Sequence, residues 1–193
     1  NYLKIATDIL DVQKGRSYCG YDPFDGLNSK LFTALGFQKN SFLRLAWLQV
    51  NKRLPLNVRP LALTPKARNP KGIGLFILGL VNDYQRTGDK TLLSEIQSLA
   101  DWLLANRSSR AQWHGSCWGY HFPWQAKAFY VPVGKPNVIT TVYCSRALYA
   151  AAQLDIANAQ GYLDAALDSA QFIERHLLTV DASGSPFVAY IPG

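Results

Sequence analysis

Hydrophobic residues recur with a helical period along most of the chain, and capping residues or helix breakers bound each run. The first run covers residues 2–14 and stops at Gly15. The pattern predicts six further helices, at residues 29–36, 41–54, 70–86, 90–106, 137–154 and 159–180. Only residues 186–192 ("PFVAYIP") resemble a strand. The fold class predicted from this pattern is all-α.

Short and long connections alternate between these helices. The short ones are residues 36–40, 87–89 and 155–160. The long ones, rich in proline, glycine and aromatic residues, are residues 15–28, 55–69, 107–136 and 179–193. Because short links make successive helices antiparallel, the alternation places the long segments at one end of the array, provided that residues 29–36 are a true helix. This is typical of an antiparallel α/α-hairpin array, either a solenoid or a toroid, with functional loops at one end.

Length and composition indicate one globular domain. The chain has 193 residues, of which 48% are hydrophobic and 17% charged. We therefore expect a single α/α-hairpin domain over residues 1–193. No apolar run approaches the roughly 20 residues of a membrane span. Because the chain has no methionine and stops just after the strand-like segment, we interpret it as a piece of a longer protein.

The formal net charge of +7 favours anionic partners. Basic residues concentrate in residues 57–72 ("NVRPLALTPKARNPKG"). Zinc-finger spacing, RNA-binding aromatic motifs and a helix-turn-helix pattern are all missing, so an acidic sugar, phosphate or carboxylate is at least as well supported as nucleic acid. Three cysteines at irregular spacing argue against a disulfide framework and favour reduced thiols in the cytoplasm, although one disulfide plus one free thiol would also fit.

The stretch "YCGYDPFDGLNS" (residues 18–29) carries two carboxylates, Asp22 and Asp25, around a proline. One interpretation is a helix start, with Asp22 as the cap, Pro23 at the first position and Asp25 facing the helix dipole. Any such helix is a single turn, because Gly26 follows at once. The other interpretation is a pair of acids for glycosyl chemistry. We expect Asp22 to shape the turn and Asp25 to reach a ligand.

The longest connection concentrates aromatic and titratable groups. Its rings could fill the mouth of a helical barrel or could form a platform that stacks on sugar rings or bases. Polar residues between the rings favour a site. The candidate ligand contacts over the whole chain are Tyr21, Asn28, Lys66, Arg68, Trp113, His114, Trp118, Trp124, Gln125 and Asn137.

Metal binding is a separate hypothesis for the same loop. His114, Cys117 and His121 fall within eight residues, with Cys19 and Cys144 available from elsewhere. Their spacing matches no familiar zinc finger or knuckle, so we predict no metal and no cofactor. We expect Cys144 to be a buried apolar residue. His176, near the end of the last helix, is expected to serve in packing or to complement the helix dipole.

Four ordered blocks, "YDPFDGLNS", "RNPKGIGLF", "CWGYHFPWQ" and "KPNVITTVYCSRAL", resemble those of bacterial proteins associated with polysaccharide biosynthesis, some of which carry an aminolevulinate dehydratase label. Such proteins resemble the six-hairpin glycosidase-like superfamily. The resemblance implies a partial or complete (α/α)6 toroid with a carbohydrate cleft at one end. It leaves the reaction open among hydrolase, lyase and epimerase.

The resemblance suggests catalytic roles for two sets of residues. In a lyase or epimerase, Tyr120 or His121 would move a proton, while Lys66 and Arg68 neutralised a uronate carboxylate. In a hydrolase, Asp22 and Asp25 would act as the acid and base.

We expect a cytoplasmic bacterial protein that acts on, or binds, an anionic glycan or sugar-phosphate precursor. A non-catalytic glycan-binding scaffold that contacts other polysaccharide-assembly proteins is one alternative. A zinc-dependent cyclase-like α-toroid of the lanthionine-synthetase type, which "HGSCWG" matches only loosely, is another. Nucleic acid is not favoured as a partner.

Overall fold

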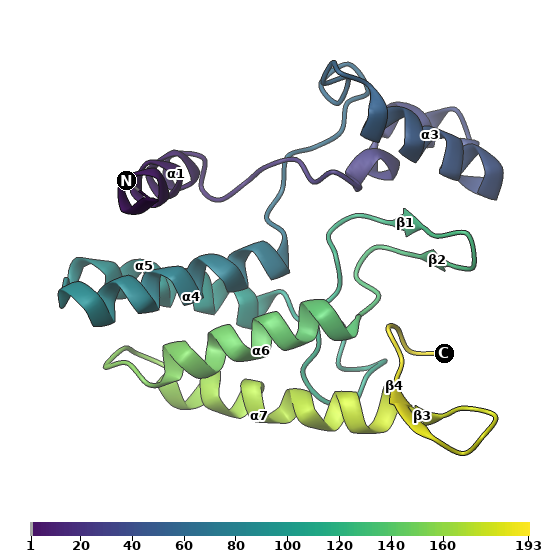
Figure 1. Cartoon of the computed structure of the whole chain (residues 1–193). Coiled ribbons are helices and arrows are strands. Elements are labelled where there is room, and N and C mark those ends of the chain that lie inside the picture. Colours follow the sequence, from purple (N-terminus) through teal and green to yellow (C-terminus); the bar gives the residue numbers. More distant parts are fainter. Residues whose placement is uncertain (1) are drawn as a thin grey trace. The chain divides into compact units, whose positions relative to one another are not determined.

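The computed structural model describes residues 2–193 and is mostly helical, with seven α-helices and two small hairpins in that range (Figure 1). The α-helices are α1 (Tyr2–Gly15), α2 (Lys30–Ala34), α3 (Ser41–Arg53), α4 (Pro70–Thr87), α5 (Thr91–Ala105), α6 (Val138–Ala152) and α7 (Ala159–His176). Two short 3-10 helices are η1 (Asp25–Asn28) and η2 (Phe37–Lys39). The strands are β1 (Trp124–Gln125), β2 (Tyr130–Val131), β3 (Leu178–Val180) and β4 (Pro186–Val188).

The chain divides into two compact units. Unit 1 comprises Asn1–Arg68 and His121–Gly134, and unit 2 comprises Asn69–Tyr120 and Lys135–Gly193. The longest connection is therefore shared, since its middle belongs to unit 1 and its two ends to unit 2. The expectation of one domain over residues 1–193 stays a prediction.

Unit 1 is built around a small core from η1, α2 and α3. Leu27, Phe32 and Leu48 are buried there, and the Phe32 and Trp47 rings stack with centroids 5.5 Å apart. Ser29 caps α2 by accepting a hydrogen bond from the Phe32 N–H, and its hydroxyl donates to the Ala62 carbonyl at 2.6 Å. This second bond attaches the long segment before α4 to the start of α2.

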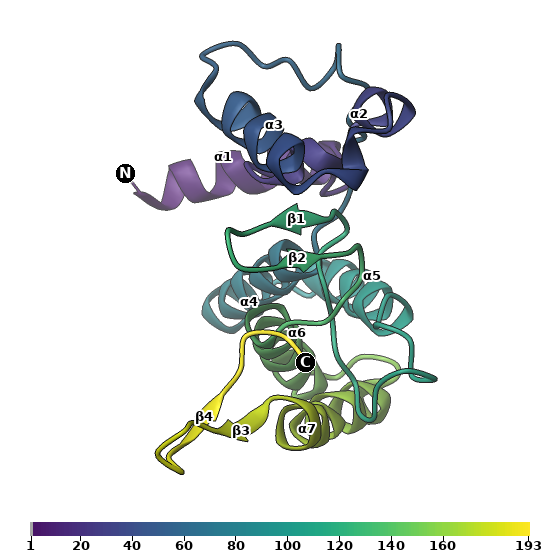
Figure 2. The same cartoon turned by 90° about the vertical axis from the view of Figure 1, so that its right-hand side faces the viewer.

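Unit 2 is a pair of antiparallel helix hairpins, α4–α5 and α6–α7, in which α4 also packs against α6. Its core consists of large apolar side chains such as Ile77, Leu103 and Phe172. Gly74 permits the close approach of α4 to α6, because a Cβ there would lie 2.9 Å from the Tyr143 carbonyl oxygen. Within unit 2 the short links lie at one end and the long segments at the other, as the connection lengths predict (Figures 1 and 2).

The ends of several elements differ from the expectation. Helix α7 ends at His176, and residues 178–180 form β3, which pairs with β4 through Leu178 and Val188. The Asp181 carboxylate folds the connecting turn by accepting hydrogen bonds from the N–H groups of Ser183 and Ser185. The strand expected over residues 186–192 covers only Pro186–Val188 in the structure. The sequence pattern does not indicate strands β1 to β3. Within residues 2–193, no helix combines the length and hydropathy that a bilayer crossing requires.

Candidate functional site

The Asp22–Asp25 turn of unit 1 is closed by two hydrogen bonds. The Phe24 N–H donates to Asp22 Oδ1 at 3.0 Å, and the Asp22 N–H donates to Asp25 Oδ2 at 3.0 Å. The helix that follows, η1, starts at Asp25 and is one 3-10 turn, and its N-cap position is Phe24. Asp22 therefore closes a local turn rather than capping a helix, which corrects the first interpretation of this stretch.

Asp25 is held by an arginine from a distant part of the chain. Arg59 Nε lies 2.7 Å from Asp25 Oδ1, and Arg59 Nη2 donates to the Asp22 carbonyl at 3.0 Å. The Asp25 side chain has no exposed surface. Both carboxylate oxygens of Asp25 therefore have partners within unit 1, which is a structural role, and ligand contact by Asp25 stays a prediction. Asp22 is half-buried and lines the neighbouring pocket.

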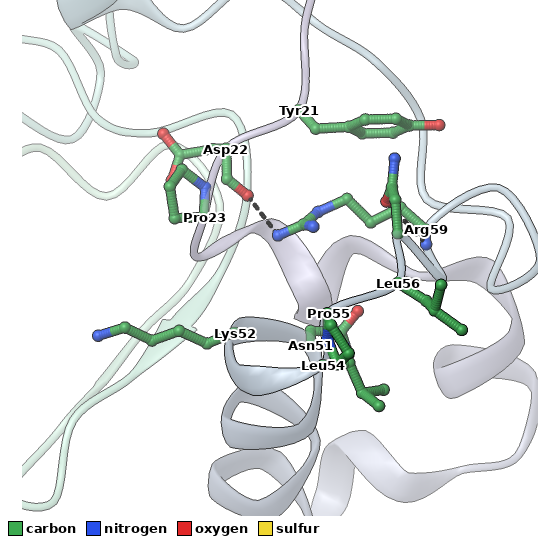
Figure 3. Close-up of a pocket in the computed structure, with 10 residues that line it drawn as sticks. Tyr21, Asp22, Pro23, Asn51, Lys52, Leu54, Pro55, Leu56 and Arg59 are labelled. Atoms are coloured by element: carbon green, nitrogen blue, oxygen red, sulfur yellow. Dashed lines mark hydrogen bonds between the residues drawn. The ribbon is translucent and has the colours of Figure 1, made fainter.

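A pocket of about 350 Å³ opens beside this turn (Figure 3). It is lined by Tyr21, Asp22, Pro23, Asn51, Lys52, Leu54, Pro55, Leu56, Asn57 and Arg59. In Figure 3, Arg59 runs between Tyr21 on one side and the apolar residues Pro55 and Leu56 on the other. The lining thus combines an aromatic ring, an apolar wall and groups of both charges, a mixture that suits a small polar ligand.

Asn51 supplies a further polar group to this pocket. The side chain is 4% exposed, and its amide nitrogen donates to the Trp47 carbonyl at 2.9 Å. Its Oδ1 is buried and has no hydrogen-bond partner among the described residues. An unsatisfied buried acceptor is costly, so a donor from a ligand or water would stabilise it.

Cationic side chains lie over aromatic rings on both sides of the turn. The Lys66 ammonium lies 5.4 Å from the centre of the Tyr21 ring, and the Lys52 ammonium lies 4.9 Å from that of Phe24. Both lysines are exposed. Arg68 donates from Nε to the Ser17 carbonyl at 2.8 Å, so it braces the loop before the turn. Asn28, the last residue of η1, is half-buried.

His121 is the titratable group of unit 1 with the most unusual surroundings. Neither Nδ1 nor Nε2 has a hydrogen-bond partner among the described residues, although both atoms are buried. Burial lowers the pKa of the imidazole, while the negative charges of Asp22 and Asp25 act in the opposite direction. The lowered pKa favours the neutral imidazole, which is the form that a general base requires, and His121 lies within electrostatic reach of the acid turn.

The β1–β2 hairpin contains two other candidates, Trp124 and Gln125. Gln125 is buried, accepts a hydrogen bond from Arg44 Nε at 2.8 Å and donates to the carbonyls of Ala126 and Phe129. It is thus committed to holding the hairpin against α3. The half-buried Trp124 ring meets Phe129 edge to face at 5.6 Å.

In unit 2, two candidates have structural roles instead of ligand contacts. Trp118 is fully buried and donates from Nε1 to the Leu103 carbonyl at 2.8 Å, so it fills the core. Asn137 is also fully buried, and its side-chain oxygen caps α6 by accepting from the Thr140 N–H. Burial therefore favours structural roles for Trp118 and Asn137, and ligand binding by them stays a prediction.

Trp113 and His114 belong to an aromatic cluster at the C-terminal end of α7. The Trp113 and His176 rings meet edge to face at 5.5 Å, and the His114 and His176 rings stack at 6.0 Å. His176 also accepts a hydrogen bond from the His114 N–H at 3.1 Å, which confirms its packing role. Gly115 allows this approach, since its φ is +84° and a Cβ would lie 2.6 Å from the Asp168 carbonyl oxygen.

Tyr120 is paired with a residue that the sequence analysis did not single out. The Tyr190 hydroxyl donates to the Tyr120 hydroxyl at 3.4 Å. Burial and the neighbouring Tyr120 raise the pKa of Tyr190. Both phenols are half-buried in unit 2. The pair could relay a proton, but a raised pKa makes Tyr190 a poor base at neutral pH.

Metal ligation gains no geometric support. Nowhere in residues 2–193 do three His, Cys, Asp or Glu side chains gather as a metal ion would require. Cys144 is buried, as expected, and burial raises its pKa. Cys117 is likewise buried, and burial raises its pKa to about 12. Because a protonated thiol is a weak ligand and a weak nucleophile, neither cysteine is suited to such chemistry at neutral pH.

The candidates therefore fall into two groups. Unit 1 holds the acid turn, its pocket and His121, while unit 2 holds Tyr120 and the cluster of Trp113 and His114. Sequence reasoning missed Asn51 and Lys52, because a polar residue near the end of a predicted helix gives no signal of lining a pocket. Comparisons with family models, with curated proteins and with solved structures gave no significant match for this chain.

Proposed function

We propose that this chain binds an anionic sugar beside the Asp22 turn and acts on it by acid–base chemistry, as a bacterial polysaccharide-biosynthesis protein. The observation that carries the proposal is the His121 imidazole. Its pKa is lowered, its ring nitrogens have no hydrogen-bond partner within residues 2–193, and the charges of Asp22 and Asp25 act on it. Lys52 and Lys66 are cations that could hold a carboxylate or phosphate group. The Tyr21 ring offers a face for a sugar ring.

The proposed chemistry is proton abstraction next to a uronate carboxylate. His121 would take the proton from the carbon beside the carboxylate, and the lysines would stabilise the negative charge that develops there. The carbanion would then either expel the oxygen substituent on the adjacent carbon, giving an unsaturated sugar, or regain a proton on the opposite face, giving the epimer. A hydrolase with Asp22 and Asp25 as its two acids is less well supported, because Asp25 is bound to Arg59.

The four sequence blocks support the wider assignment. They resemble proteins of the six-hairpin glycosidase-like superfamily, and the two antiparallel hairpins of unit 2 are compatible with part of an (α/α)6 toroid. We propose such a toroid as the architecture of the longer protein, and cytoplasmic polysaccharide synthesis as its setting.

The test is incubation of the protein with oligosaccharides of uronic acids in D2O, followed by NMR. Proton exchange beside the carboxylate or a new double bond is expected. His121→Gln should reduce turnover by roughly 100-fold or more while sugar binding persists. Lys52→Gln should raise KM, whereas Lys39→Gln, an exposed lysine of unit 1 outside the pocket, should not. Failure to bind any acidic sugar would overturn the proposal.

A second candidate function is glycan binding without catalysis. The ion pair between Asp25 and Arg59 favours a binding function, because a binding module needs no pair of free acids. Saturable binding of uronate oligosaccharides without exchange, elimination or epimerisation would support this candidate over the enzyme.

A further inference from the structure

Unit 2 contains a second pocket, of about 570 Å³, that none of the roles proposed above uses. It lies along α7 beside the C-terminal end of α5 and the segment that follows α5. The residues that line it are Leu104, Arg107, Arg110, Gly161, Asp164, Ala165, Leu167, Asp168 and Gln171. Its volume is within the range of sites for small molecules, roughly 300–1,000 Å³.

Arg107 is fixed in this pocket by neutral groups. Its Nε donates to the Leu104 carbonyl at 2.9 Å, and its Nη1 donates to Ser116 Oγ at 3.1 Å. These bonds use two of the five N–H donors of the guanidinium. The guanidinium is thus oriented in advance and keeps donors for a ligand.

Arg110 brings a second guanidinium to the same pocket. Its Nη2 lies 3.4 Å from Asp168 Oδ2, and the side chain is 58% exposed. The same Asp168 oxygen already accepts a hydrogen bond from the Ser116 hydroxyl at 2.8 Å. Asp168 is therefore shared, and the ion pair with Arg110 is long and open to water.

The two guanidiniums repel each other. Burial and the positive charge of Arg110 both lower the pKa of Arg107, and Asp168 only partly opposes this. A bound anion would relieve the repulsion, and planar guanidiniums match the geometry of carboxylate and phosphate oxygens. The carboxylates of Asp164 and Asp168 and the Gln171 amide would then accept or donate hydrogen bonds to hydroxyl groups.

We infer that this pocket is a second ligand site, which takes a hydroxylated anion of monosaccharide size. The anionic group binds Arg107 and Arg110, and the hydroxyl groups face Asp164 and Asp168. A sugar acid and a sugar phosphate share this chemistry. The site lies wholly in unit 2, so the inference does not depend on whether unit 1 is catalytic.

Isothermal titration calorimetry of the full chain with glucuronate, glucose 6-phosphate and uncharged glucose tests this. All titrations use the Lys52→Gln variant as the parent protein, because this substitution is expected to weaken sugar binding at the unit 1 site. Saturable binding of at least one anionic sugar, much tighter than that of glucose, is expected. The carboxylate and phosphate probes distinguish the two ligand sources.

Arg110→Gln should then weaken that binding about tenfold or more, because a charge-assisted hydrogen bond is lost. The control is Arg86→Gln, which removes an exposed arginine paired with Asp83 on α4, outside the pocket. Equal affinity in Arg110→Gln, an equal loss in Arg86→Gln, or no preference over glucose would each overturn the inference. Circular dichroism would verify that both variants remain folded.

Discussion

Asp25 and Arg59 form a buried ion pair in which Arg59 Nε lies 2.7 Å from Asp25 Oδ1. The two residues are 34 positions apart, and their bond joins the acid turn to the long segment before α4. Since the Arg59 side chain is 13% exposed and that of Asp25 is not exposed, removal of either partner leaves a desolvated charge. The acid that looked most suited to a ligand therefore stabilises the fold.

Substitution of Asp25 is expected to reduce stability strongly. Asp25→Ala should lower the free energy of unfolding of unit 1 by about 3–5 kcal/mol, measured by chemical denaturation. Asp83→Ala, which breaks the exposed pair with Arg86, should cost less than about 1 kcal/mol. The double variant Asp25→Ala/Arg59→Met should lose less than the sum of the single variants. A stable Asp25→Ala protein that no longer binds sugar would instead restore Asp25 as a ligand contact.

His121 should make stability depend on pH. Its folded-state pKa is lowered by burial, so the unfolded chain binds a proton more readily. The contribution of His121 is thus complete above the unfolded pKa of about 6.5 and is lost as the pH falls below it. The stability difference between the unmodified protein and His121→Gln should grow from pH 5 to pH 7.5, measured by urea denaturation.

Substitution of Asp22 tests whether His121 is the source of that pH dependence. Its negative charge raises the pKa of His121 against the effect of burial. Asp22→Asn should therefore lower the pKa further and increase the loss of stability in acid. An unchanged or opposite pH dependence would show that His121 is hydrated or paired in solution.

Gly115 should tolerate no side chain. Its φ of +84° disfavours other residues, and a Cβ would lie 2.6 Å from both the Asp168 carbonyl oxygen and the Phe172 amide nitrogen. Gly88 is the matched control, because its φ is +70° but a Cβ built there meets no atom of residues 2–193 within 4 Å, apart from its chain neighbours. Gly88→Ala should cost about 1–2 kcal/mol, and Gly115→Ala clearly more, by thermal or urea denaturation. Equal costs would mean that the loop does not pack on α7 as described.

The sequence predicted elements whose signals are local. Pro70 and Gly88 bound α4 at Pro70–Thr87, within one residue of the expected end, because a proline start and a left-handed glycine stop act within one turn. The apolar run continues through residues 178–180, so helical periodicity extends the last helix over them. Their pairing with residues 186–188 depends on the Asp181 turn, which helical periodicity does not register.

The candidate site was predictable in composition but not in role. Asp22 and Tyr21 do line a pocket, whereas Trp118, Gln125 and Asn137 are buried in structural hydrogen bonds. Residue type indicates what a side chain can bind but not whether it is exposed. Long-range partners decide that, and a single sequence carries no signal for them.

Substitution of Trp118 distinguishes the two interpretations of the aromatic loop, which are core packing and a platform for ligand stacking. Trp118→Phe removes the Nε1–H that the Leu103 carbonyl accepts and leaves a gap in a fully buried place. The free energy of unfolding should fall by about 2–4 kcal/mol, from an unsatisfied acceptor and a cavity. Sugar affinity, measured by calorimetry, should stay the same, and the half-buried Trp113, changed to Phe, should cost less. A loss of sugar binding without a loss of stability would show instead that the Trp118 ring stacks on a ligand.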